Sequence, residues 1–100
     1  MPLFAMLLER GAGWRHGEPL SAQDGWDGHR DFMNGLEGSG VVVLGGTLDP
    51  KPAALLVVRA ADEAALRAIF AADPWWRSGL LSPAWIAPLE PRLGAARLAG

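Results

Sequence analysis

The sequence contains no cysteine, no tyrosine and no block of basic residues. Without cysteine the protein has neither disulfide bonds nor thiolate metal ligands, which fits a cytoplasmic location. Its formal net charge is −2, from 9 basic and 11 acidic residues, so it lacks the positive surface of nucleic-acid-binding proteins. The apolar run at residues 3–8 has no basic leader and is too short for a signal peptide or a membrane span. We therefore expect a cytoplasmic protein that binds neither nucleic acid nor membrane.

The chain has the size and composition of one compact domain. Its 100 residues are 50% hydrophobic, which is enough apolar side chain for a core of its own. No internal repeat or linker interrupts the sequence. We assign residues 1–94 to the domain and residues 95–100 to a C-terminal tail.

The N-terminal half predicts one strand, one long loop and one helix. Residues 3–8 are apolar on both faces of an extended chain, as in a strand that is covered on both sides. Residues 11–24 form a polar loop that is long enough to carry function. Residues 25–38 are a predicted helix with Asp24 as its N-cap. The inward stripe of this helix recurs at helical spacing and comprises Trp26, His29, Met33 and Leu36.

The C-terminal half predicts three strands and a second helix. Residues 41–44 and 54–59 are expected to be the two strands of a hairpin, joined by a turn at residues 47–53. Residues 62–72 form the second helix, which Pro74 ends because the residue before a proline avoids the helical conformation. The remaining expectations are a loop or short turn at 75–81, an edge strand at 83–89 and a short helical segment at 95–98.

The resulting order is strand, helix, strand, strand, helix, strand, which is the ferredoxin-like α+β arrangement. Its two helices cover one face of a four-stranded antiparallel sheet. The first and third strands are apolar on both faces, and each buried apolar side chain contributes roughly 1.5–3 kcal/mol, so the open face needs a cover. We expect a homodimer that packs sheet to sheet. Alternatively, the C-terminal tail or the long loop covers this face.

His29 and Asp73 are predicted to meet at one end of the domain. Asp73 lies seven residues after Leu66, on the inward stripe of the second helix. Burying an unpaired carboxylate costs several kcal/mol, so Asp73 needs a partner. In this topology the first helix begins and the second helix ends at the same end of the sheet, which places His29 beside Asp73. The loop at residues 11–24 emerges at that end as well.

This pair indicates acid–base chemistry on a small molecule. A histidine with one ring nitrogen held by a carboxylate has a fixed tautomer, and its other nitrogen can take a proton from a substrate. Tryptophan side chains at the same end would supply an apolar wall for a flat ligand. The predicted wall residues are Trp14, Trp26, Trp75 and Trp76.

Each of these residues also has a purely structural explanation. A histidine on an apolar helix face is often a hydrogen-bonded core residue, and an acid before proline often caps or ends a helix. Each tryptophan is also a natural core residue. Trp85, on the last strand, is assigned to packing or to the dimer interface. His16 lies in a glycine-rich loop and is expected to be solvated.

No motif in the sequence requires a cofactor or a metal. A metal site would have to combine His16 and His29 with carboxylates such as Asp27 or Asp73, and these residues lack the spacing of a ligand motif. Gly45-Gly46 precedes a predicted turn rather than a helix, so it is a weak candidate for binding phosphate. We therefore expect a protein without a cofactor.

The sequence resembles the YCII-related (YciI-like) family over nearly its whole length. The matching features are Trp26-Asp27-Gly28-His29 with Phe32-Met33 and Leu36, then Val42-Val43-Leu44-Gly45-Gly46, then Asp73-Pro74-Trp75 with Gly79-Leu80-Leu81. The resemblance implies a dimeric α+β barrel with an active site on His29 and Asp73. It also implies kinship with muconolactone-isomerase-like proteins and with dehydrochlorinases of chlorinated aromatic compounds. At Gly45-Gly46-Thr47 the sequence departs from the family, in which Gly-Pro is frequent.

Together these features predict a small enzyme of the lyase or isomerase kind, acting on a small aromatic-derived or lactone substrate. His29 would be the general acid/base, and Asp73 would orient it. The alternative is a non-catalytic dimer that binds a small ligand, or serves as an accessory protein, through the same pocket. A purely structural dimer would gain no evident benefit from a buried His–Asp pair.

Overall fold

The computed structural model describes residues 1–49 and 53–98 as a four-stranded sheet covered by helices. The strands are β1 (Leu3–Arg10), β2 (Val42–Leu48), β3 (Ala53–Arg59) and β4 (Leu81–Leu89), and the helices are α1 (Trp26–Gly38), α2 (Glu63–Phe70) and α3 (Pro74–Ser78). Two short 3-10 turns are η1 (Leu20–Ala22) and η2 (Ala95–Leu98). Neighbouring strands are antiparallel, in the order β2-β3-β1-β4. The predicted ferredoxin-like α+β fold is confirmed.

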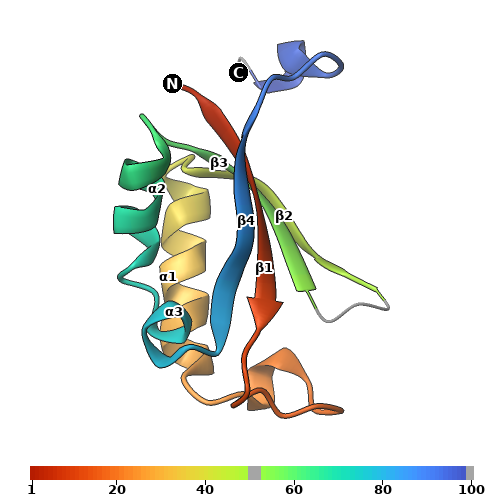
Figure 1. Ribbon diagram of the computed structural model, residues 1–100, viewed down its shortest axis with the longest axis vertical. Coiled ribbons are helices and arrows are strands. Elements are labelled where there is room, and N and C mark those ends of the chain that lie inside the picture. Colours follow the sequence, from red (N-terminus) through yellow and green to blue (C-terminus); the bar gives the residue numbers. More distant parts are fainter. Residues whose placement is uncertain (50–52, 99–100) are drawn as a thin grey trace.

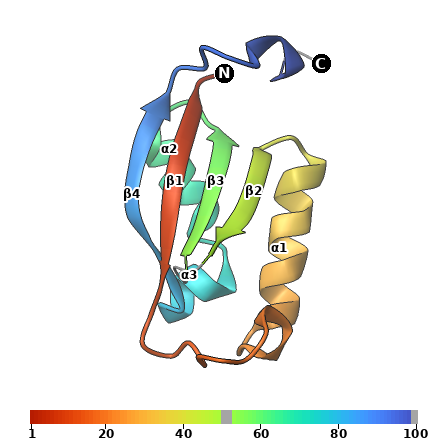
Figure 2. The ribbon, with the colours of Figure 1, turned by 90° about the vertical axis from the view of Figure 1, so that its right-hand side faces the viewer.

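The helices lie together on one side of the sheet, and the core lies between the two layers (Figure 1). Alternate side chains of β1, namely Phe4, Met6 and Leu8, are buried on the helix side. They belong to one hydrophobic cluster with Leu66 and Phe70 of α2, both of which are fully buried. Figure 2 shows α1 beside β2, at one edge of the sheet, with α2 and α3 behind the other strands.

The opposite side of the sheet is apolar and open. Strand register places Leu44 of β2 in line with Val57 of β3 and Ala5 of β1, all on this side. Leu44 is 68% exposed and Trp85 of β4 is 46% exposed, so neither is covered. The loop at residues 11–24 and the C-terminal turn η2 lie at opposite ends of the strands (Figure 1). The prediction of strands with two apolar faces is confirmed, and neither the loop nor the described part of the tail, residues 95–98, covers the open face.

Three local predictions are wrong. The N-cap of α1 is Gly25, at φ +75°, and not Asp24, whose carboxylate instead pairs with Arg15 at 2.8 Å. Thr47 and Leu48 continue β2 rather than starting a turn, and the rest of that predicted turn falls largely on residues 50–52, outside the described residues.

The third difference concerns the segment after α2, which was expected to be a loop or short turn. It forms the helix α3, with Pro74 in its first turn. Proline is well suited to that position because its fixed φ is helical and its missing N–H would have no partner there. The same Asp73-Pro74 step that ends α2 therefore begins α3.

Candidate active site

His29 and Asp73 lie in direct contact although 44 residues separate them in the sequence. The His29 Nδ1 atom is 3.0 Å from both carboxylate oxygens of Asp73. The Asp73 side chain is 1% exposed and the His29 side chain 12% exposed, so the contact is screened from water. The geometry follows from the topology, since the start of α1 and the end of α2 meet at one end of the sheet.

Asp73 is held in place by its role as N-cap of α3. Its Oδ1 atom accepts a hydrogen bond from the backbone N–H of Trp75 at 2.9 Å. Gly28 lets the first turn of α1 approach this cap, because a Cβ at that position would lie 3.0 Å from the Cγ atom of Pro74. A larger residue at position 28 would require Pro74 or the start of α1 to shift.

These contacts define the tautomer of the histidine. A carboxylate can only accept hydrogen bonds, so Asp73 requires a proton on His29 Nδ1. In the neutral ring the unshared electron pair then lies on Nε2. Nε2 has no hydrogen-bond partner among residues 1–49 and 53–98. It is therefore the nitrogen that is available to a ligand.

Trp75 supports the imidazole from the side. Its indole ring is stacked on the His29 ring, with centroids 3.8 Å apart and planes 6° from parallel. The indole is buried, and its Nε1–H donates to the backbone carbonyl of Asp24 at 2.7 Å. Trp14, also buried, packs edge-on against Trp75 at 5.2 Å.

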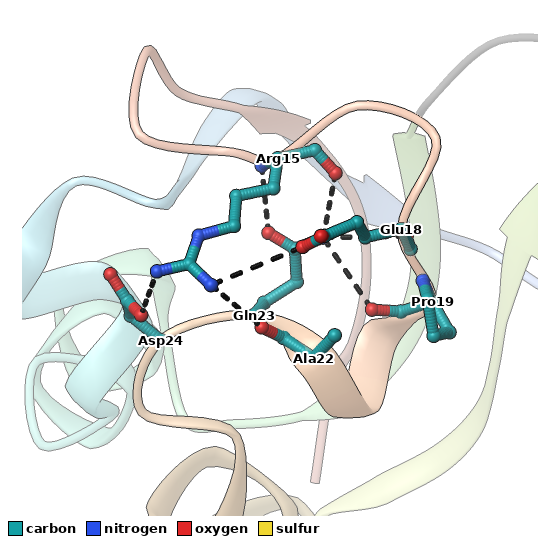
Figure 3. A network of polar contacts seen from close by, with 6 residues as sticks. All are labelled: Arg15, Glu18, Pro19, Ala22, Gln23 and Asp24. Atoms are coloured by element: carbon teal, nitrogen blue, oxygen red, sulfur yellow. Dashed lines mark hydrogen bonds and ion pairs between the residues drawn. The ribbon is translucent and has the colours of Figure 1, made fainter.

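The loop that brings Trp14 to this position is fixed by the buried side chain of Gln23 (Figure 3). Its Oε1 atom accepts from the backbone N–H of Arg15 at 2.8 Å, and its Nε2 atom donates to the Arg15 carbonyl at 2.9 Å. The Arg15 guanidinium in turn contacts the carboxylate of Asp24 at 2.8 Å. The loop that was predicted to carry function thus supports the Trp75 side of the His29–Trp75 stack, through the packing of Trp14 and the carbonyl of Asp24.

A cavity of about 250 Å³ lies between α1 and the strands β2 and β3, with His29 in its wall. Apolar side chains of the core form much of the lining, and Asn34, Glu37 and Thr47 are its other polar residues. The strand side is formed in part by Gly45, Gly46 and Ala54, so the space exists where the sheet carries little or no side chain. The full lining is Leu8, His29, Met33, Asn34, Glu37, Val42, Gly45, Gly46, Thr47, Ala54, Leu56 and Leu81.

The tryptophans predicted to form the pocket wall do not line this cavity. Trp14 and Trp75 are buried behind His29. Trp26 lies 6.2 Å from the His29 ring, and Trp76 packs against Phe70 at 5.4 Å. The cavity wall was instead signalled by Gly45-Gly46, because glycine inside a strand often marks a place where a ligand approaches the backbone.

The other candidate groups lie away from the pair. His16 is exposed in the loop, as expected. Within the described part of the chain, no three His, Cys, Asp or Glu side chains are placed to hold a metal ion. None of the helices in that part is long and apolar enough to cross a membrane.

The fold and the site together define a class of protein, namely ferredoxin-like domains that have a buried His–Asp pair beside a small cavity. The sequence model of the YCII-related domain matches residues 15–89, and the chain belongs to this family. None of the curated proteins matches the sequence significantly.

One solved structure of similar fold is 5-chloro-2-hydroxyhydroquinone dehydrochlorinase (TftG) from Burkholderia phenoliruptrix AC1100, in complex with 2,5-dihydroxybenzoquinone. The TM-score is 0.59 and the sequence identity is 17%, over 94% of this chain and 97% of that chain. At this identity the likeness shows a shared fold along the whole domain.

Proposed function

We propose that this protein is an enzyme of the lyase or isomerase kind that moves protons on a small hydroxylated ring or lactone, with His29 as general acid/base. One observation carries the proposal. Asp73 holds Nδ1 of His29, a residue that lines the cavity, and Nε2 has no hydrogen-bond partner among the described residues. A positioned imidazole of this kind is the commonest proton-transfer group in enzymes.

The chemistry follows from the tautomer. Nε2 takes a proton from a ring hydroxyl, and the electron pair of the broken O–H bond forms a carbonyl. Asp73 stabilises the imidazolium that results, because its carboxylate faces the positively charged ring at 3.0 Å. The same imidazole then returns the proton to a ring carbon, which completes an isomerisation. Where that carbon bears chlorine, Nε2, now unprotonated again, takes the proton of a second ring hydroxyl while the C–Cl bond breaks, so that chloride leaves and the overall reaction is an elimination of HCl.

The cavity supports a small and largely apolar substrate. About 250 Å³ is just below the usual range for ligand pockets, which suits a single substituted ring. TftG was solved with 2,5-dihydroxybenzoquinone, a compound of that size, and it shares the fold of this domain. This likeness supports a hydroxylated ring as the first substrate class to test.

The open sheet face supports a homodimer. A continuous apolar surface that includes Leu44, Val57 and Trp85 is unusual on a monomer and favours burial against a second copy of the chain. Two copies related by a twofold axis would present the same face to each other. We propose a sheet-to-sheet dimer in which the two cavities lie on the outer, helical sides.

Chloride release from 5-chloro-2-hydroxyhydroquinone under nitrogen tests the reaction. The intact protein should release chloride, His29→Gln should abolish release, and Asp73→Asn should slow it by a factor of roughly 10²–10⁴. His16→Gln is the matched control, because it removes the other, exposed histidine and should leave the rate unchanged.

Calorimetric titration with 2,5-dihydroxybenzoquinone separates the two functions that the sequence left open. Binding together with chloride release supports the enzyme. Binding by both the intact protein and His29→Gln, with no chloride release by either, would favour the non-catalytic ligand-binding protein. A rate that does not change in His29→Gln would contradict the role proposed for His29.

A further inference from the structure

Glu37 lies in the wall of the cavity, in the last turn of α1. His29 lies in the first turns of the same helix, and both residues belong to the side that faces the cavity. Eight residues separate them, which corresponds to about 12 Å along the helix axis. The cavity therefore has one polar group near each end of α1, with the apolar side chain of Met33 between them.

The position of Glu37 is not explained by helix stability. The C-terminal end of a helix carries partial negative charge, so an acidic side chain there is unfavourable. The two other acids of α1, Asp27 and Asp31, both pair with Arg30. The Glu37 carboxylate has no ion-pair or hydrogen-bond partner in residues 1–49 and 53–98. Its side chain is exposed at the mouth of the cavity, where a ligand can replace the water around the carboxylate.

The negative charge of Glu37 favours a ligand that donates hydrogen bonds over one that carries a carboxylate. Within the described ranges, the lining includes neither lysine nor arginine. A ligand carboxylate placed near Glu37 would be repelled by a like charge, and no cation among the described lining residues would neutralise it. A ligand hydroxyl would instead donate a hydrogen bond to the Glu37 carboxylate, and bonds to a charged acceptor are stronger than neutral ones. The Asn34 amide, which also lines the cavity, can donate or accept beside it.

We propose that Glu37 is a specificity-determining residue that accepts a hydrogen bond from a substrate hydroxyl remote from the reacting atoms. The substrate class is then a flat ring with hydroxyl groups at opposite positions, and aromatic carboxylates are rejected. A ring of this kind, with one hydrogen bond at each end, is comparable in length to the rise of about 12 Å between the two residues along α1. This inference rests on the proposed function, in which His29 acts at the other end of the ring.

Two probe compounds of equal ring size test the inference by calorimetric titration, namely 1,4-dihydroxybenzene and 4-hydroxybenzoate. The intact protein should bind the diol at least about tenfold more tightly than the carboxylate. Glu37→Gln should reduce this ratio, and Glu37→Lys should reverse it because the lysine can pair with the carboxylate. Asp31→Lys makes the same change in net charge at an exposed position of α1 that does not line the cavity, and it should leave the ratio unchanged.

The inference is overturned if the intact protein prefers 4-hydroxybenzoate, or if Glu37→Lys and Asp31→Lys shift the ratio equally. Circular dichroism of each variant shows that the helix is intact before the ratio is compared. The titrations are repeated in His29→Gln, which should bind with the same preference and lack turnover. If the intact protein shows normal turnover but no preference for the diol, only the role of Glu37 is refuted, whereas turnover that survives in His29→Gln refutes only the proposed function.

Discussion

The indole of Trp75 lies flat on the imidazole of His29, with ring centroids 3.8 Å apart. The backbone N–H of the same residue donates to the carboxylate of Asp73 at 2.9 Å. One residue of α3 therefore fixes the plane of the histidine and the position of its acidic partner. The short helix that the sequence did not predict is the element that assembles the site.

Replacing Trp75 should cost more stability than replacing its neighbour Trp76. Trp75→Phe removes the Nε1–H bond to the Asp24 carbonyl and part of the stacking area, so we expect a loss of about 1–3 kcal/mol. Trp76 Nε1 is buried and has no hydrogen-bond partner in the described residues. Trp76→Phe removes this unsatisfied donor, which offsets part of the stability lost with the smaller ring. Urea denaturation of both variants measures the difference. Equal losses would show that the indole contacts of Trp75 contribute little.

Asp73 and Asp62 are both N-caps of helices, so the effects of replacing them can be compared directly. Asp62 caps α2 by accepting from the Ala65 N–H at 2.7 Å, and Asp62→Ala should cost about 1 kcal/mol. Asp73→Ala loses a similar cap and also leaves the Nδ1–H of His29 unpaired, so we expect roughly 2–4 kcal/mol. The free energies of unfolding of the two variants should therefore differ clearly. If they coincide, the His29–Asp73 contact is not a stabilising one.

Gly45 should control the depth of the cavity. A Cβ at this position would lie 2.5 Å from Cδ2 of Leu56, which also lines the cavity, so Gly45→Ala forces the leucine to move and reduces the space. We expect about tenfold weaker binding of 2,5-dihydroxybenzoquinone, measured by calorimetry.

Gly35→Ala is the control for Gly45→Ala, because an added methyl group meets nothing within 4 Å on that turn of α1. It should raise stability by roughly 0.5–1 kcal/mol and leave ligand affinity unchanged. Unaltered binding by Gly45→Ala would place the ligand outside this cavity.

The open sheet face gives a prediction about assembly. Leu44→Glu puts a charge on the apolar surface, so light scattering should show a change from twice the chain mass to the chain mass. Leu93 is 93% exposed and lies beyond the end of β4, so Leu93→Glu should leave the mass unchanged. A single-chain mass for the intact protein would contradict the dimer.

The fold could be predicted because each long element has a recognisable apolar pattern. Residues 3–8 are a short uninterrupted apolar run, the apolar residues of α1 recur at spacings of three and four, and the resulting order admits one common topology. The contact between His29 and Asp73 followed from that topology together with the inward position of each residue on its helix. Both predictions need only the chain direction and the spacing of apolar residues, and not the packing of individual side chains.

The parts that escaped prediction depend on contacts between neighbours. The helix α3 has five residues, which is too short to show a period, and its Asp73-Pro74 start also signals a helix end. The place of the cavity depends on side chains that are absent at Gly45 and Gly46, and absence produces no pattern of its own. Trp75 was expected to touch a ligand, because a sequence does not show which face of an indole is already occupied.

The tautomer of His29 is the property on which the proposed chemistry depends most directly. Long-range proton–nitrogen NMR of nitrogen-15-labelled protein measures it, and the His16→Gln variant assigns the signals of the two histidines. In the neutral ring we predict a proton on Nδ1 and none on Nε2, with loss of this preference in Asp73→Asn. A neutral His29 that carries its proton on Nε2 would contradict the account, because the ring nitrogen that Asp73 does not hold could not then act as a base.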